Sequence, residues 1–276
     1  MKYFILLMAI LTSGASVGAQ VPDAEPENIE ADLPDGVEPL LRGPIHEAFA
    51  EPLQLDDEEP FIVKEEPPEP IDEVPPAVRP EDGENLAWIP GYWAWDDERN
   101  DYIWVSGVWR RAPHNRMWDP GYWEQVDDGY RWIPGRWSVN LVGGEEPQLL
   151  PQPPESLEEG PVGEQKSDDH FWVPGVWKRV AGKYQWRAGF WSQCHDNWVW
   201  IPDHYVTAVN GCYFVPGYWD YGWAHRGRLF APCYIDRGIR VGFRWHPRVA
   251  LDVSTAFTHL WVRPRHCHYF FGDYYA

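Results

Sequence analysis

Aromatic residues recur along the chain in a six-residue phrase, Trp-x-x-Gly-x-Trp, with polar, turn-forming residues between the copies. The starting positions differ by 16, 14, 14, 40, 14, 14 and 14 residues, so the phrases form two blocks of four. A constant interval of this length indicates that one short structural unit has been duplicated. Clean copies begin at Trp88, Trp104, Trp118, Trp132, Trp172 and Trp186, and degenerate copies begin at Trp200 and Phe214.

Turn-forming pairs stand at regular places between the phrases. Asp-Gly and Asn-Gly tolerate the positive φ values of tight hairpins, whereas the Trp, Tyr, Val and Ile between them suit a pleated strand. We therefore expect an all-β fold, an antiparallel meander of two four-unit blocks. A two-residue turn at Asp128-Gly129 predicts that Trp123 pairs with Pro134. The turn pairs are His114-Asn115, Asp128-Gly129, Gly182-Lys183, Asp196-Asn197 and Asn210-Gly211.

The glycine of the phrase resolves a conflict in the strand pattern. Trp132 and Trp137 are five residues apart, so a regular strand would send them to opposite faces. Either a bulge at Gly135 or a two-residue turn at Pro134-Gly135 puts both rings on one side. Asp203 replaces the glycine in one degenerate copy. We expect that copy to be distorted but intact, because Asp is among the few residues other than glycine that adopt positive φ.

This pattern gathers the aromatic rings on one face of each block. Burying a large ring contributes up to about 4 to 6 kcal/mol before the entropy of ordering it is subtracted. We therefore expect most rings in a core, with the two blocks packed as a sandwich or closed as a barrel. The alternative is an exposed platform on which sugar rings stack, with arginines as hydrogen-bond donors. Its candidate binding residues are Trp93, Trp109, Trp123, Trp137, Trp177, Trp191, Trp219, Arg263 and Arg265.

The segments outside the repeats differ from them in composition. Residues 1–19 contain a lysine, a short apolar run and small residues, as in a secretory signal peptide, and no stretch is apolar over a length that spans a bilayer. Residues 20–87 hold 21 acidic residues against three basic ones and 13 of the 28 prolines, which predicts a disordered stalk. The expected parts are the signal peptide 1–19, stalk 20–87, first block 88–140, acidic linker 141–171, second block 172–219 and β-rich cap 220–276.

Charge is distributed unevenly within the formal net charge of −20. Residues 172–276 carry twelve Lys and Arg against six Asp, so this end is basic. The acidic segments either maintain solubility and neutralise the basic end, or compete with an anionic partner for it. Nucleic acid is not an expected partner of an exported acidic protein. We expect the cap to cover the open end of the second block, because terminal repeats otherwise expose an apolar edge.

All four cysteines lie in the second half of the chain. An even count in an exported protein predicts two disulfides, with three possible pairings. A metal site is the less favoured alternative. His266, Cys267 and His268 are adjacent, but the paired spacing of a metal motif is missing, so we expect no metal and no cofactor. The disulfide candidates are Cys194, Cys212, Cys233 and Cys267.

The clean phrases resemble the YXWGXW, or WXXGXW, repeat of bacterial envelope proteins, some of them labelled BcpO-related. The resemblance covers residues 88–137 and 172–219, and it implies an exported, non-catalytic role without an active site to carry over.

The chain contains no recognisable catalytic motif, so we do not expect an enzyme. The leading hypothesis is a structural or interaction protein of the periplasm, the cell surface or the extracellular space. The alternative is a module that binds glycan or wall polymer. The expected partners are an envelope polysaccharide or another envelope protein, with no membrane-spanning segment.

Overall fold

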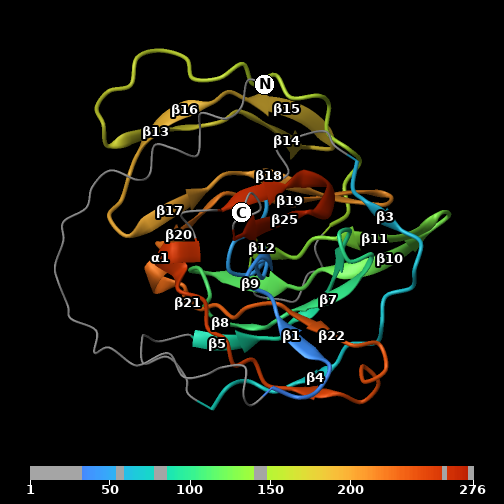
Figure 1. Cartoon of the computed structure of the whole chain (residues 1–276). Coiled ribbons are helices and arrows are strands. Elements are labelled where there is room, and N and C mark those ends of the chain that lie inside the picture. Colours follow the sequence, from blue (N-terminus) through green and yellow to red (C-terminus); the bar gives the residue numbers. More distant parts are fainter. Residues whose placement is uncertain (1–32, 54–58, 78–85, 140–147, 257–259, 273–276) are drawn as a thin grey trace, which may run out of the picture.

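The computed structural model describes residues 33–53, 59–77, 86–139, 148–256 and 260–272. Over these residues the protein is built from short strands, paired antiparallel except for the parallel pair of residues 72–73 and 244–245, which confirms the predicted all-β class (Figure 1). The helical elements of the described part are short: α1 (Val253–Ala256), η2 (Trp223–His225) and η4 (Pro264–His266). The predicted signal peptide lies outside the described residues.

Each pair of successive phrases folds into one antiparallel hairpin, whose first strand pairs with the fourth and whose second pairs with the third. We call the four described hairpins A to D in chain order. Hairpin A contains β5 (Leu86–Ile89), β6 (Tyr92–Asp96), β7 (Asp101–Val105) and β8 (Val108–Arg111). Hairpin B contains β9 (Arg116–Asp119), β10 (Tyr122–Val126), β11 (Gly129–Ile133) and β12 (Arg136–Val139). Hairpin C contains β13 (His170–Val173), β14 (Val176–Val180), β15 (Lys183–Arg187) and β16 (Phe190–Gln193). Hairpin D contains β17 (Trp198–Ile201), β18 (His204–Ala208), β19 (Gly211–Val215) and β20 (Tyr218–Tyr221).

The register of hairpin B corrects the predicted one. Trp123 lies opposite Trp132, not Pro134, because Val126 pairs with Gly129 and the turn is formed by residues 127 and 128. Pro134-Gly135 interrupts the strand and is not a turn that brings the two Trp residues of one phrase together. The first Trp of each phrase instead meets the second Trp of the partner phrase.

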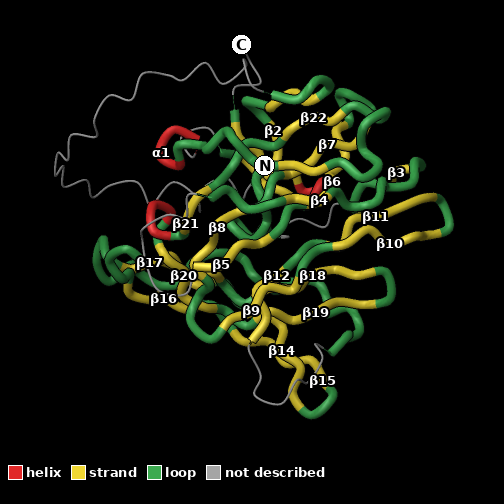
Figure 2. The backbone as a smooth tube through the Cα atoms, turned by 90° about the horizontal axis from the view of Figure 1, so that it is seen from below, coloured by secondary structure: helices red, strands yellow, loops and turns green. Residues whose placement is uncertain are grey.

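The hairpins stack in the spatial order A, B, D, C, which differs from their order in the chain (Figures 1 and 2). Trp123 of hairpin B donates its indole N–H to the carbonyl of Trp93 in hairpin A, at 2.8 Å. Arg116 of hairpin B donates to the carbonyl of Pro216 in hairpin D, at 2.7 Å. The hydroxyl of Tyr205 in hairpin D donates to the carbonyl of Trp177 in hairpin C, at 2.7 Å. The described sheets remain separate and do not close into one barrel.

Residues 33–53 and 59–77 of the predicted stalk are folded against the rest of the protein, so the expectation of a disordered segment is wrong for these residues, whereas residues 20–32 lie outside the described ranges. Ile45 and Phe49 are almost fully buried in one core cluster, and Val63 is buried in another. These apolar residues are spread thinly among acids and prolines, so the average composition hides them. The segment forms four short strands. β1 (Val37–Pro39) pairs with β22 (Cys233–Ile235), β2 (Gly43–Pro44) with β25 (His268–Phe271), β3 (Ile62–Val63) with β11, and β4 (Asp72–Glu73) with β23 (Arg244–Trp245).

Two of the C-terminal strands pair with hairpin A of the first block, whereas the sequence suggested a cap over the end of the second block. β21 pairs with β8, and β22 pairs with β7. At the opposite end of the stack, residues 148–169 run across hairpin C, and we call this segment the strap. The C-terminal strands are β21 (Gly227–Arg228), β22 (Cys233–Ile235), β23 (Arg244–Trp245), β24 (Trp261–Arg263) and β25 (His268–Phe271).

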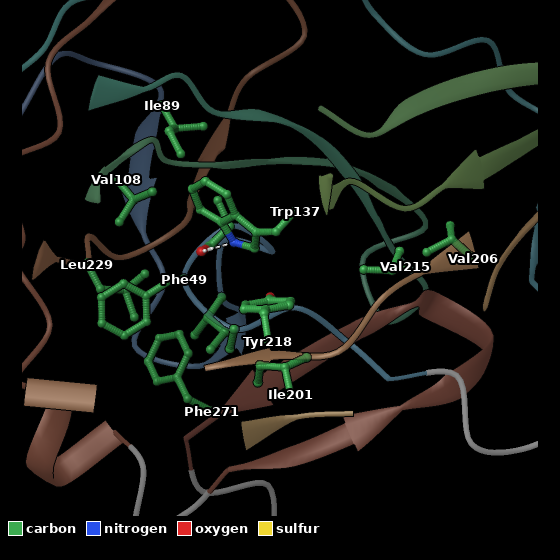
Figure 3. Packing of buried hydrophobic residues seen from close by; sticks show 13 residues of the cluster. Phe49, Ile89, Val108, Trp137, Ile201, Val206, Val215, Tyr218, Leu229 and Phe271 are labelled. Carbon is green, nitrogen blue, oxygen red and sulfur yellow. Dashed lines mark hydrogen bonds between the residues drawn. The ribbon is translucent and has the colours of Figure 1, made fainter. Parts of the chain in front are cut away.

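The largest core cluster surrounds the N-terminal segment 45–50. Phe49 and Trp137 are buried there together with Leu229 and Phe271 from the C-terminal part (Figure 3). The carbonyl of Ala48 accepts the indole N–H of Trp137 at 3.2 Å. The N-terminal segment is therefore an interior part of the molecule.

A buried ion cluster holds this segment in place. Arg110 and Arg226 both pair with Asp220, at 2.6 and 3.0 Å. Arg110 also donates to the carbonyl of Ala48, and Arg226 to the carbonyl of Phe49. Buried charges need such partners, because an unpaired charge in the interior is costly.

Candidate functional site

The aromatic residues of the phrases meet across the strands of each hairpin. Their ring centroids lie 5.1 to 5.6 Å apart, with interplanar angles of 52° to 78°. Edge-to-face pairs of this kind contribute about 0.5 to 1.5 kcal/mol beyond the burial of area. The pairs in the described hairpins are Trp88–Trp109, Trp93–Trp104, Trp118–Trp137, Trp123–Trp132, Trp172–Trp191, Trp177–Trp186, Trp200–Trp219 and Tyr205–Phe214.

The phrase glycine is required by close approach of an indole ring. A Cβ atom on Gly135 would lie 2.3 Å from a ring carbon of Trp118, and one on Gly121 would lie 2.4 Å from a ring carbon of Trp132. The first Trp of one phrase thus packs over the glycine of the partner phrase. Neither glycine has a positive φ, so each is required because the ring approaches it closely and leaves no room for a Cβ atom.

Glu73 places a carboxyl group between the two glycines of hairpin A. It accepts hydrogen bonds from the backbone N–H of Gly91 at 2.7 Å, the backbone N–H of Gly107 at 3.0 Å and the indole N–H of Trp104 at 2.9 Å. The interruption of both strands leaves these N–H groups without a strand partner, so an acceptor from outside the hairpin is needed. Burial raises the pKa of Glu73.

Glu47 forms the same arrangement in hairpin B. Its carboxyl group accepts the indole N–H of Trp132 at 2.7 Å and the backbone N–H of Gly135 at 2.8 Å. Burial raises the pKa of Glu47 to about 8, although the two hydrogen bonds act in the opposite direction. We call a carboxyl group that joins a Trp indole N–H and a glycine N–H of one phrase a carboxyl clip.

Glu158 of the strap is the carboxyl clip of hairpin C. It accepts the indole N–H of Trp172 at 2.9 Å and the backbone N–H of Gly175 at 2.5 Å. Three acidic residues from segments outside the repeats therefore bind three hairpins with the same chemistry. The acidic linker is thus bound to the second block over the described residues 148–169 and is not a free spacer.

In hairpin D the carboxyl group comes from the hairpin itself, from Asp203 in the phrase that begins at Trp200. Asp203 accepts the backbone N–H of Gly217 at 2.9 Å and binds Arg187 of hairpin C at 3.0 Å. Asp203 does not adopt a positive φ. Phe214 offers no indole N–H, and the buried indole N–H of Trp200 has no hydrogen-bond partner among the described residues. In hairpin D, the carboxyl group of Asp203 therefore joins two hairpins, whereas the carboxyl clips join a segment outside the repeats to one hairpin.

A second set of buried polar groups surrounds Glu47. The Tyr92 hydroxyl lies 2.9 Å from Nε2 of His268, and its ring stacks on Trp132 with centroids 4.8 Å apart. Burial lowers the pKa of His268 to about 3 and that of His46 to about 4, so both are neutral near pH 7. The surroundings of Glu47 thus favour its protonated form.

The predicted stacking residues do not form an open platform. Trp93 and Trp137 are buried, and the other five are half-buried against their cross-strand partners. Those five are Trp109, Trp123, Trp177, Trp191 and Trp219.

The two predicted arginines are engaged within the molecule. Arg263 pairs with Asp97 at 2.8 Å, and the Arg265 guanidinium lies over the ring of Phe61. The structure does bring Arg265 and Trp123 together at one cavity, but its volume is about 20 Å³. This is room for about one water molecule, not for a sugar ring.

The cysteines do not form the two expected disulfides. None of the four is in a disulfide bond: Cys194 is exposed, whereas Cys212, Cys233 and Cys267 are buried on different elements. Within the described ranges, no group of three or more His, Cys, Asp and Glu side chains could hold a metal ion. No helix in the same ranges has the length and apolar character needed to cross a membrane.

Sequence reasoning missed the carboxyl clips. Glu47 carried a usable signal, because it is a lone acid in the apolar run from Ile45 to Ala50. Glu73 and Glu158 stand among many similar acids and prolines, so nothing in their local sequence distinguishes them.

The fold and its clips define a repeat protein of paired-phrase β-hairpins. The model of the WXXGXW repeat family, which spans two copies of the motif, matches residues 87–110, 117–138 and 168–192. These segments therefore carry WXXGXW repeats, and they coincide closely with hairpins A, B and C. Searches among curated proteins and among solved structures found no match.

Proposed function

We propose that this chain is an exported, non-catalytic structural protein of the bacterial cell envelope. Its stacked hairpins form a rigid β scaffold, and its acidic segments are bound to that scaffold through carboxyl clips. This proposal is supported by the contacts of the repeats, whose aromatic rings and N–H groups find their partners within the molecule. Trp104 and Trp132 pack against cross-strand rings, and their indole N–H groups are taken by Glu73 and Glu47.

The export part of the proposal is supported by the signal-like sequence of residues 1–19 and by the resemblance to envelope repeat proteins. The test is cell fractionation of a tagged chain expressed in a bacterium, with a chain lacking residues 1–19 as the control. We expect the full chain in the envelope or periplasmic fraction and the shortened chain in the cytoplasm. Equal cytoplasmic retention of both chains would contradict export.

The scaffold part is separated from polymer binding by co-sedimentation with isolated cell-wall polysaccharide. We expect the purified chain to stay in the supernatant, because the seven Trp rings that could stack on sugars are buried or half-buried. Sedimentation with the polymer that is lost in Trp177→Ala and Trp191→Ala chains of unchanged circular dichroism would favour a glycan-binding module instead. These two residues are chosen because their rings are half-buried on hairpin C, at the end of the stack.

A further inference from the structure

In three of the four hairpins, a segment from outside the hairpin pairs with the outer edge of the third strand. In hairpin A, Cys233 of β22 pairs with Trp104 of β7. In hairpin B, β3 pairs with β11. In hairpin D, Leu150 of the strap forms a bridge with Cys212 of β19, with backbone hydrogen bonds of 2.8 Å in both directions. The third strand is thus the place at which these hairpins are extended.

The third strand of hairpin C lacks such a neighbour. Within the described ranges, β15 pairs only with β14. Trp186 is the fourth residue of β15, as Trp104 is the fourth residue of β7, and each pairs with the second residue of the preceding strand. Trp186 and Trp104 therefore direct the same backbone groups to the outer edge. An edge of this kind is a template for the addition of another strand.

A strap across the face of a hairpin and a strand at its edge are compatible, as hairpin A shows. The carbonyl of Glu155 in the strap accepts the indole N–H of Trp177 at 2.9 Å. In hairpin A, the carbonyl of Glu69 accepts the indole N–H of Trp93 in the same way, at 3.0 Å. Hairpin A nevertheless pairs with β22 at its edge. The strap of hairpin C therefore leaves the edge of β15 available.

The charges beside this edge are opposite in the two hairpins. Asp101 is the first residue of β7, and it binds Arg237 at 2.9 Å and Arg240 at 3.1 Å. These two arginines follow the added strand β22 in the sequence. The first residue of β15 is Lys183, which is exposed. A strand that is added to β15 therefore needs acidic residues where the segment after β22 has arginines.

The rest of hairpin C has the same charge as Lys183. Residues 170–193 contain four Lys and Arg and no Asp or Glu, whereas residues 86–111 of hairpin A contain four acidic and three basic residues. Phe190, in the adjoining strand β16, is 47% exposed and offers apolar surface. Hairpin C also lies at the end of the stack, where a partner can reach it (Figure 1).

From this comparison we propose that the outer edge of β15 binds an extended acidic segment of a partner protein by strand addition. The segment pairs with Trp186 through its backbone and places carboxyl groups beside Lys183. The β22 segment of a second copy does not fit, because its arginines would meet Lys183. This inference rests on the proposed scaffold function and defines the chemistry of its partner. It is tested by peptide binding to the purified chain, so its failure leaves the fractionation and co-sedimentation results unaffected.

The probe is a labelled peptide of residues 230–241 with Cys233→Val, Arg237→Glu and Arg240→Glu, and the control peptide carries Cys233→Val alone. Fluorescence anisotropy at low salt measures the affinity of each. We expect the acidic peptide to bind about tenfold more tightly or better, because two attractive charges replace two repulsive ones. Lys183→Glu in the protein should reverse this preference. Lys64→Glu, the same change at an exposed lysine outside hairpin C, should leave it unchanged.

Two further readouts separate strand addition from simple charge attraction. The acidic peptide with N-methyl groups on residues 233 and 234 cannot donate backbone hydrogen bonds to either edge, so it should not bind. The unmethylated peptide should slow hydrogen exchange in residues 183–187 but not in residues 129–133, because β3 already pairs with β11.

Three results would overturn the proposal. The first is no binding of the acidic peptide, and the second is equal binding of the N-methylated peptide. The third is binding only to a chain that lacks residues 20–32, which would assign the edge to the acidic N-terminal part of the chain itself.

Discussion

The indole N–H of Trp132 donates a hydrogen bond of 2.7 Å to the carboxyl group of Glu47, which lies 85 residues earlier in the chain. The same group accepts the backbone N–H of Gly135. One acidic side chain thus satisfies both polar groups that the phrase leaves unpaired. The WxxGxW phrase supplies an aromatic pair, a close ring-over-glycine contact and an acceptor site for one carboxyl group.

Loss of a carboxyl clip is expected to destabilise the whole protein. Glu73→Ala leaves the N–H groups of Gly91, Gly107 and Trp104 without their acceptor, so the free energy of unfolding should fall by about 3 kcal/mol or more. Urea unfolding measures this change. Glu66→Gln, an exposed acid seven residues earlier, is the matched control and should change stability by less than about 0.5 kcal/mol. Equal effects of the two substitutions would argue against the clip.

A methyl group on a phrase glycine should be poorly tolerated. Gly135→Ala puts Cβ within 2.3 Å of the Trp118 ring, so we expect a loss of about 2 to 4 kcal/mol in unfolding free energy. Trp118→Phe in the same chain should recover part of this loss, because the smaller ring leaves room, as in hairpin D where Asp203 and Phe214 occur together. The control is Gly182→Asn, since Gly182 has open space and a φ of 79° that Asn accepts. A loss no larger than that of the control would refute the close-approach explanation.

The repeat period and the β class could be predicted because both are local properties of the sequence. The predicted register of hairpin B was wrong by two residues, since the choice between residues 127–128 and 128–129 as the turn depends on Trp123 meeting Trp132. That contact forms only in the folded hairpin.

The acidic segments were misjudged for a different reason. Their composition is that of a solvated chain, yet Ile45 and Phe49 are buried and Glu47 is bound between them. Whether these acidic segments fold onto the repeats is decided by a few residues whose partners lie far along the sequence. The order of the hairpins and the place of the C-terminal strands depend on similar long-range contacts, such as that of Arg116 with Pro216.

Stability should decrease as the pH rises above neutrality because of Glu47. Its pKa is about 8 in the folded protein, above its ordinary value of 4.5, so the folded state binds the proton more tightly than the unfolded state does. This contribution is complete below about pH 4.5 and is lost as the pH rises through about 8, with a slope of up to about 1.4 kcal/mol per pH unit. The measurement is the free energy of unfolding as a function of pH. Glu47→Gln should lower stability at low pH and flatten the slope on the alkaline side, and an unchanged slope would contradict the assignment.

The thiols should react as single residues and not as disulfides. In the native protein a thiol reagent should modify Cys194 quickly, and Cys212, Cys233 and Cys267 only after unfolding. Cys194→Ser should abolish the fast phase. Addition of a reducing agent should leave the free energy of unfolding unchanged. A fall in stability on reduction would show that the purified protein holds a disulfide.

Hydrogen exchange of the indole N–H groups, followed by NMR on ¹⁵N-labelled protein, examines the carboxyl clips most directly. The indole N–H groups of Trp104, Trp132 and Trp172 should exchange slowly, and Glu73→Gln, Glu47→Gln and Glu158→Gln should each accelerate and shift the signal of its own partner. If all three signals exchange as fast as a solvent-exposed indole, or if the three substitutions leave them unchanged, then the acidic segments are not bound to the repeats through carboxyl clips.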